Sequence, residues 1–415
     1  VYSPGYWGID GVSYGAGSSL ASAVYALYVG SSSPVSLYSG GTLSIGGGDV
    51  FLTNARLQST GDMGVVLDPR GGEIRNIGSA SKLKSTSGNI ALNATGSYSG
   101  NQGEISADSG NLTIRGDTVA SSGTLHASGT LDLADTRPFV FGDSVTVSLS
   151  GTTLANSVSI TASNRMNLDG SLEAAGDLNL NIGGNLVVGA SGRILAATSG
   201  SGTGSITVGT PVNGAELMNY GVVHSFRNMA ITGSIVNYYS GGISALGTMT
   251  LAGTGSQHMY NAGGTIYATE ALTALYTDAI INGAGGALET AGDMALTAGV
   301  FGNLADSPGG SITKAAGNLT VTAGQFTNQE QIIAGPTSTL TIQGFNTGEN
   351  TGAGALLSAG TITLTGNGGG ATFTNSGTIR ADTLNAVGFG LTNSGSPGAA
   401  TTTPLAARGC RSGQT

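Results

Sequence analysis

Ala316-Gly-Asn-Leu-Thr-Val321 is the stretch of sequence that decides the fold, because the same phrase returns along most of the chain. A small residue and Gly are followed by Asn, Asp or Thr, and then by two apolar residues with one residue between them. Other copies begin at residues 87, 109, 128, 175, 291 and 359. Apolar positions two apart are typical of a half-buried strand, whereas a helix needs spacings of three and four. Each copy therefore predicts a turn followed by a short strand.

A second phrase, Phe373-Thr-Asn-Ser-Gly-Thr-Ile-Arg-Ala381, alternates with the first in the second half of the chain. Its asparagine recurs after 18, 24, 21, 21 and 25 residues, at Asn219, Asn237, Asn261, Asn282, Asn303 and Asn328. A period near twenty that holds two or three short strands fits one coil of a solenoid. We predict an all-β fold, a right-handed parallel β-helix of about 20-residue coils. Each Asn should bond its neighbours' backbone amides as a ladder, and Gly should fill corners where φ is positive.

Composition agrees with a repeat protein built from turns and short strands. The 415 residues include 73 Gly, with 39% hydrophobic and only 9% charged residues, so apolar side chains are buried in small repeated portions. The net charge of −9 and the scattered basic residues argue against nucleic acid as a partner. The only cysteine, Cys410, excludes an intramolecular disulfide.

The repeat pattern gives the predicted boundaries. Residues 1–39 should be irregular or partial first coils, residues 40–395 the repeat shaft, and residues 396–415 a disordered tail. The apolar stretch Leu20–Val29 is too short to span a bilayer and has no basic region before it, so we predict no transmembrane segment and no signal peptide. The chain reads as a fragment of a longer protein.

The two phrases, alternating at about twenty residues, resemble the central repeat region of the filamentous haemagglutinin family. These large exoproteins leave Gram-negative bacteria by two-partner secretion. The resemblance covers about residues 40–395 and rests on the Ala316–Val321 and Phe373–Ala381 phrases. It implies a β-helical rod that holds adhesive or toxic modules away from the cell, and an outer-membrane transporter as partner during export.

Three functions follow from this scaffold. The first is a structural and adhesive segment of a secreted or surface-exposed exoprotein, which contacts host receptors, host glycans or neighbouring bacteria. The second is the stalk of a contact-dependent growth inhibition toxin. The third is a carbohydrate-active β-helix enzyme, since such folds place carboxylates along a groove. We favour the first, which is not an enzyme and needs no cofactor or metal.

Two motifs are candidates for recognition or modification. Arg115-Gly116-Asp117 is the tripeptide that integrins read, and members of the resembled family sometimes carry it; the alternative is a plain corner after the strand Leu112–Ile114. Three glycosylation sequons are present, and they begin at Asn93, Asn111 and Asn318. The last two are copies of the repeated phrase, so we interpret them as turn residues.

The remaining candidates are titratable or aromatic. Two carboxylate pairs are close in sequence, Glu289 with Asp293 and Asp132 with Asp135, but their spacing does not dictate a shared face. No metal site or catalytic triad is indicated by the three histidines, His126, His224 and His258. Five tyrosines concentrate within residues 220–280: Tyr238, Tyr239, Tyr260, Tyr267 and Tyr276. They could form an exposed strip that stacks on sugars, or they could stack on one another inside the solenoid, and both alternatives stay open.

Overall fold

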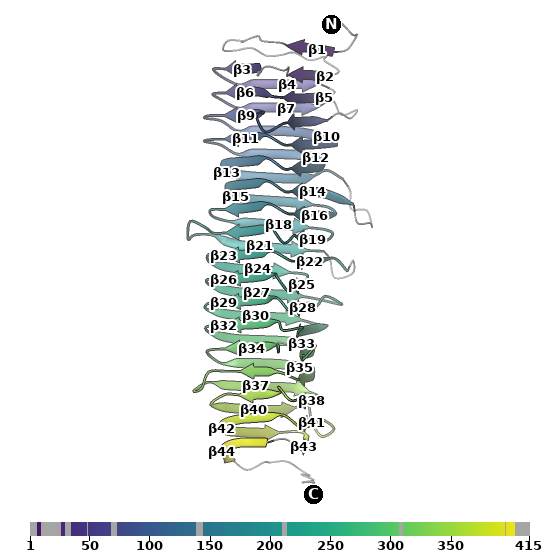
Figure 1. Ribbon diagram of the computed structural model, residues 1–415, viewed down its shortest axis with the longest axis vertical. Helices are drawn as coiled ribbons and strands as arrows, with labels where there is room; N and C mark the ends of the chain where they lie inside the picture. The colour runs from purple at the N-terminus through teal and green to yellow at the C-terminus, as the bar shows by residue number, and fades with distance from the viewer. Residues whose placement is uncertain are drawn as a thin grey trace. The chain divides into compact units, whose positions relative to one another are not determined.

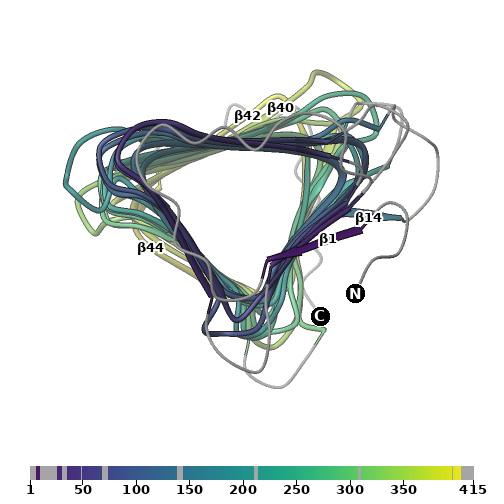
Figure 2. The same ribbon diagram turned by 90° about the horizontal axis from the view of Figure 1, so that it is seen from above.

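The computed structural model describes residues 6–9, 26–29, 35–47, 49–67, 73–137, 144–209, 214–306, 310–394 and 396–402. These residues form strands joined by turns, and no helix occurs among them. The chain divides into two compact units, residues 1–208 (unit 1) and 209–415 (unit 2). Each unit is a parallel β-solenoid, as predicted, with coils of about 22 residues that have three sides (Figures 1 and 2).

In unit 1 the strands of successive coils pair in parallel on three faces. The first face holds β1 (Tyr6–Ile9), β2 (Ala26–Val29), β5 (Asp49–Thr53), β8 (Ile74–Ile77), the ends of β10 (Ile90–Asn101) and β12 (Leu112–Ser121), β14 (Val145–Leu149), β16 (Arg165–Leu168) and β19 (Leu186–Val188). The second face holds β3 (Val35–Ser39), β6 (Ala55–Ser59), β9 (Lys82–Ser85), β11 (Glu104–Ala107), the starts of β13 (Thr124–Asp135) and β15 (Thr152–Ala162), β17 (Ser171–Ala174) and β20 (Arg193–Ala196). The third face holds β4 (Leu43–Gly47), β7 (Met63–Leu67), the starts of β10 and β12, the ends of β13 and β15, β18 (Leu178–Ile182) and β21 (Thr203–Val208).

Unit 2 repeats the arrangement. Its first face holds β22 (Glu216–Asn219), β25 (Ser234–Tyr238), β28 (Met259–Ala262), β31 (Ala279–Gly283), the ends of β33 (Asp293–Asn303) and β35 (Leu319–Asn328), β38 (Thr347–Asn350), β41 (Thr372–Asn375) and β43 (Gly390–Asn393). The second face holds β23 (Val222–Ser225), β26 (Gly242–Ala245), β29 (Thr265–Ala268), β32 (Ala287–Thr290), β34 (Ile312–Ala315), β36 (Gln331–Ile333), β39 (Leu356–Ser358) and the starts of β42 (Thr378–Val387) and β44 (Ser396–Thr402). The third face holds β24 (Asn228–Thr232), β27 (Thr248–Gly253), β30 (Ala271–Tyr276), the starts of β33 and β35, β37 (Thr339–Phe345), β40 (Thr361–Gly366) and the ends of β42 and β44.

The repeated phrase forms the corner before the third face and the strand that follows. Its first apolar position stacks on itself from coil to coil, as in the buried column Leu319, Leu340 and Ile362. Its Asn or Asp accepts a hydrogen bond from the backbone of the next coil: Asn318 Oδ1 accepts one from the Thr339 amide at 3.0 Å. The phrase therefore supplies both the core and the link between coils.

The asparagines of the second phrase form a ladder inside unit 2. Each Nδ2 donates to the Oδ1 of the asparagine one coil later, at 2.6–3.0 Å, along Asn219, Asn237, Asn261, Asn282, Asn303, Asn328, Asn350, Asn375 and Asn393. The predicted ladder is thus present, but its rungs run from side chain to side chain. Backbone carbonyls take the other Nδ2 hydrogen, as when Asn261 donates to Ala287 O at 3.1 Å.

Glycine occupies positions of positive φ at Gly78, Gly263 and Gly285, among others, as predicted, but the glycine of the repeated phrase has a different role. Neither Gly292 nor Gly317 has a φ in the left-handed region. A Cβ at Gly292 would lie 1.5 Å from the carbonyl oxygen of Glu270, and one at Gly317 would lie 2.2 Å from Asp293 Oδ1. Close approach between coils, rather than backbone conformation, requires Gly at this corner.

The parallel ladder extends beyond the predicted shaft. At the amino-terminal side, β3 pairs with β6 over Val35–Ser39. At the carboxy-terminal side, β44 pairs with β42 over Ser396–Thr402, within the stretch predicted as a disordered tail. The repeated phrases fade near residues 40 and 395, but backbone pairing between coils does not depend on these phrases. Cys410 and most of residues 1–34 lie outside the described residues.

Candidate functional site

The Arg115-Gly116-Asp117 tripeptide lies where β12 bends from the third face to the first. Arg115 and Gly116 pair in register with Ala134 and Asp135 of the next coil. The Arg115 guanidinium forms an ion pair with Asp132 and donates to that residue's backbone oxygen at 3.2 Å. Gly116 is buried in the ladder.

The acidic end of the tripeptide is also engaged. Asp117 is half-buried, accepts a hydrogen bond from the Thr136 hydroxyl, and has Arg137 Nε at 3.9 Å from its Oδ2. The tripeptide is therefore part of the coil's own hydrogen-bond network. A receptor that reads both charges would have to compete with these partners.

The carboxylate pairs are not brought together as acid and base. Glu289 points outward from β32 on the second face, opposite Tyr267 and Lys314, whereas Asp293 begins the third face and accepts a bond from the Asn318 amide at 2.7 Å. Asp135 Oδ2 accepts two hydrogen bonds from Ser163, one from the backbone amide at 2.8 Å and one from the hydroxyl at 2.9 Å. Asp293 and Asp135 thus each link one coil to the next through hydrogen bonds.

The histidines have local partners. His126 Nδ1 lies 3.2 Å from Ser106 Oγ, and His224 Nδ1 lies 2.8 Å from Ser244 Oγ. Burial lowers the pKa of His224. Within the described ranges no three His, Cys, Asp or Glu side chains gather closely enough to hold a metal ion. The same ranges contain no helix of the length and apolar character that crossing a bilayer requires.

Two of the sequon asparagines have a structural role. Asn111 Oδ1 accepts a bond from the Thr130 amide at 2.8 Å, and Asn318 makes the equivalent bond to Thr339. Asn93 lies in β10, in register with Arg115. The first two side chains thus act as the turn residues that the phrase predicts.

The internal ring stack of unit 2 is built from phenylalanines, which the sequence reasoning missed. Phe301 and Phe326 stack in parallel with centroids 5.7 Å apart, one coil from each other. Phe373 continues the column, and Phe345 and Phe389 pack against it at 5.6 and 5.8 Å. The signal available in the sequence was the phrase position itself, because Phe301, Phe326 and Phe373 each precede the ladder asparagine by two residues.

Of the tyrosines of residues 220–280, all of them described, only Tyr276 is fully internal. It is 1% exposed and donates its hydroxyl to Gly233 O at 3.2 Å. Four others gather on the outer side of the first face and at the corner that follows: Tyr220, Tyr238, Tyr239 and Tyr260. We call these four the tyrosine patch.

Ring stacking and the pairing of neighbouring strands hold the tyrosine patch in place. Tyr220 and Tyr238 stack with centroids 4.2 Å apart and planes 3° apart. Tyr260 pairs in register with Val236, two residues before Tyr238. Tyr239 and Tyr260 are 68% and 39% exposed. The patch therefore combines a fixed ring stack with two open rings.

Gly263 provides the seat for Tyr239. A Cβ on this glycine would lie 2.3 Å from Cδ1 of the Tyr239 ring, and its φ of 85° is left-handed. Any other residue would push the ring away and strain the turn. One side of the most exposed ring of the patch is thus packed against the backbone of Gly263, and the rest of the ring is open to solvent.

Polar groups border the patch. His258 Nε2 lies 3.3 Å from Glu216 Oε1, both on the outer side of the first face. The hydrogen bond with Tyr220 raises the pKa of Tyr238, and burial adds to the effect. Aromatic faces beside hydroxyl, imidazole and carboxylate groups form a surface suited to a sugar.

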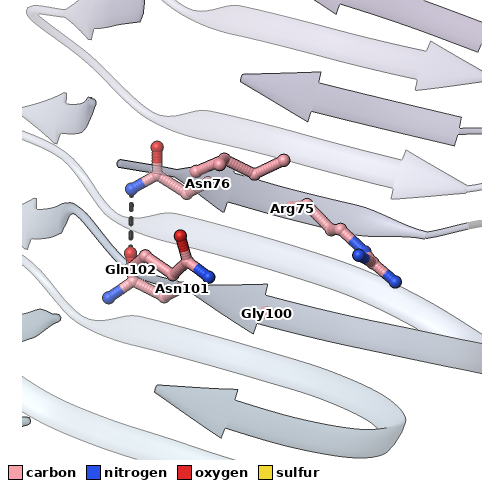
Figure 3. A pocket seen from close by; sticks show the side chains of 6 residues that line it. Arg75, Asn76, Gly100, Asn101 and Gln102 are labelled. Atoms are coloured by element: carbon pink, nitrogen blue, oxygen red, sulfur yellow. Dashed lines mark hydrogen bonds between the residues drawn. The ribbon is translucent and has the colours of Figure 1, made fainter. Parts of the chain in front are cut away.

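A small hollow in unit 1 marks the start of a shorter asparagine ladder (Figure 3). Its lining includes Asn76 and Asn101, whose side chains are joined by a 2.8 Å hydrogen bond. In the preceding coil the residue that pairs with Asn76 is Leu52, whose side chain has no hydrogen-bond donor. The buried Asn76 Oδ1 therefore has no hydrogen-bond partner among the described residues. The hollow is a consequence of where the ladder begins.

No protein-family model, curated protein or solved structure matches this chain. The resemblance to the filamentous haemagglutinin family stays a prediction from its two phrases, while the parallel β-solenoid is a property of the structure.

Proposed function

We propose that this chain is a structural and adhesive segment of a large bacterial exoprotein, secreted or held at the cell surface, and that its tyrosine patch binds glycans of a host cell or a neighbouring bacterium. The observation that carries the proposal is the exposure of Tyr239 and Tyr260 beside the Tyr220–Tyr238 stack. Export through an outer-membrane transporter belongs to the same proposal, as the family resemblance implies.

The chemistry favours a sugar over a charged macromolecule. The CH groups on one face of a pyranose ring pack on an aromatic ring, and its hydroxyls need donors and acceptors at the edge of the contact. Glu216 and His258 supply both kinds of group next to the rings. The net charge of −9 disfavours nucleic acid and anionic surfaces as partners.

The solenoid supports adhesion by keeping the patch rigid. Tyr220, Tyr238 and Tyr260 belong to the first face or its corner, where parallel pairing fixes each backbone against the next coil. Rings held in this way lose little conformational freedom on binding, which favours affinity.

Glycan-array binding by the full chain tests the proposal. Tyr239→Ala and Tyr260→Ala should each weaken binding about tenfold, equivalent to about 1.4 kcal/mol, because each removes an exposed ring from the contact. Tyr38→Ala is the matched control, since Tyr38 is a 49% exposed tyrosine of unit 1. Circular dichroism should show unchanged β structure in all three variants.

Binding that survives both patch variants, or that Tyr38→Ala weakens equally, would contradict a role for the patch. Absence of glycan binding by the wild-type chain would leave the solenoid as a spacer.

A further inference from the structure

The outer side of the third face of unit 2 carries an array of threonines. Successive coils place them in columns. In one column Thr339 pairs with Thr361, which in turn pairs with Thr383. In the next column Thr341 pairs with Thr320 on one side and Thr363 on the other. A further column contains Thr322, Gln343 and Thr365. We call the threonines of these columns the threonine array: Thr320, Thr322, Thr339, Thr341, Thr361, Thr363, Thr365 and Thr383.

The array is a regular two-dimensional lattice. Neighbouring strands lie about 4.8 Å apart, and outward residues of one strand lie roughly 6.6 Å apart. The third face forms a straight side of the coil, where β40 and β42 are labelled (Figure 2). All of these threonines are half-buried, while the residues between them, such as Leu340 and Ile362, point into the core. Hydroxyls and methyls thus repeat at fixed intervals on one plane.

Threonine is suited to such a lattice because its branched Cβ restricts χ1. The hydroxyl and the methyl group therefore keep nearly the same orientation from coil to coil. At one edge, Gln343 Nε2 donates to Thr322 Oγ1 at 3.1 Å, which ties two neighbouring coils together within the plane. The lattice is stiff as well as regular.

The array is also uncharged. The outward residues of β35, β37, β40 and β42 that pair on this face, all within the described ranges, carry no charge. The exposed Asp382 lies at the corner directly before Thr383. The other two faces of unit 2 differ, since Glu349 points outward from the first and Lys314 and Arg380 from the second. An uncharged, periodic face is complementary to an uncharged, periodic surface, and it offers no electrostatic attraction to a charged macromolecule.

We propose that the threonine array binds ice. Water beside a methyl group is restricted in orientation, and water on a hydroxyl is fixed by a hydrogen bond. When both repeat on a flat and rigid lattice, the first water layer becomes ordered and can join the surface of an ice crystal. This proposal does not depend on the tyrosine patch, which lies on a different face.

Thermal hysteresis of the purified full chain tests the proposal, with the growth of ice crystals followed under a microscope. The wild-type chain should lower the freezing point below the melting point. Thr363→Tyr, in the centre of the array, should lose this hysteresis because the ring stands above the plane. Thr327→Tyr is the matched control: Thr327 points outward from the first face, between Gly302 and Glu349, and should keep the hysteresis.

Circular dichroism verifies that both variants keep the β structure of the wild-type chain. No hysteresis in the wild-type chain would overturn the proposal, as would equal loss, or equal retention, in the two variants. Sedimentation with a crystalline polysaccharide that Thr363→Tyr abolishes, without hysteresis in the wild type, would also overturn it and assign the array to a carbohydrate lattice.

Discussion

Asn282 Nδ2 donates to Asn303 Oδ1 at 3.0 Å in the interior of unit 2, one coil away along the chain. The same nitrogen donates to Ile312 O at 2.9 Å, and both asparagines are fully buried. Each asparagine between the ends of the ladder thus accepts a hydrogen bond from the asparagine one coil earlier and donates one to a neighbouring backbone carbonyl. Buried amides of this kind are stabilising only while every partner is present.

Replacement of Asn282 by Leu should therefore destabilise unit 2. The variant leaves Asn261 Nδ2 without its side-chain acceptor and Ile312 O without its donor. At about 1–3 kcal/mol for each of these two buried groups left without a partner, the expected loss is about 2–6 kcal/mol. Hydrogen exchange of the flanking coils measures it, since a solenoid can open locally.

Asn346→Ala is the control for the ladder prediction, because Asn346 Oδ1 accepts a bond from Asn367 Nδ2 at 3.3 Å on the exposed surface. Its effect should stay within about 0.5 kcal/mol. Equal protection of the ladder coils in Asn282→Leu and in the wild type would mean that the ladder adds little to stability.

Much of the fold could be predicted because the repeat encodes it locally. The Ala316–Val321 phrase contains the corner glycine, the residue that bonds the next coil, and the two core positions. Backbone pairing then has only one register in which the apolar columns stay inside. The asparagine ladder followed from the same periodicity.

The surface sites could not be predicted in the same way, because they depend on which faces lie together. Thr341 and Thr363 are 22 residues apart in the sequence and neighbours in the array, yet each reads simply as the polar position of a strand. Likewise, the sequence does not distinguish the buried Tyr276 from the exposed Tyr239. Only the coil-to-coil register separates core from surface.

Gly348 offers a second test of packing. The position two residues before the ladder Asn350 is occupied by Phe in several coils, but here it is Gly, and Phe345 fills the space beside Phe373. A Cβ at Gly348 would lie 2.5 Å from the Phe373 ring. Gly348→Ala should therefore cost about 1–3 kcal/mol of stability through overpacking.

The double variant with Phe373→Leu isolates this contact. The smaller side chain should relieve the clash, so the cost of Gly348→Ala should fall in the Phe373→Leu background, as measured by urea unfolding. Additive costs would show that the ring is not what restricts position 348.

Stability should also depend on pH through His224. Burial lowers the pKa of His224 in the folded chain below its ordinary value of 6.5. The unfolded chain then binds a proton more readily, so the stabilisation is complete above the unfolded pKa and is lost as pH falls through it toward the folded pKa. Urea midpoints of the wild type should decrease between about pH 7.5 and 5.5. His224→Gln should show a smaller decrease, and parallel pH profiles would contradict this assignment.

The ion pair of Arg115 leads to the last prediction, on the tripeptide that integrins read. Because Arg115 pairs with Asp132 and Asp117 with Thr136 and Arg137, the tripeptide is occupied within the coil. Asp117→Glu should therefore leave adhesion of the purified chain to integrin-bearing cells unchanged, whereas Tyr260→Ala should reduce adhesion that depends on glycans. Asp132→Ala, which frees the Arg115 guanidinium, should cost at most about 1 kcal/mol, since the pair is partly exposed. Adhesion lost in Asp117→Glu alone, with β structure preserved, would show instead that a receptor displaces these partners and reads the tripeptide.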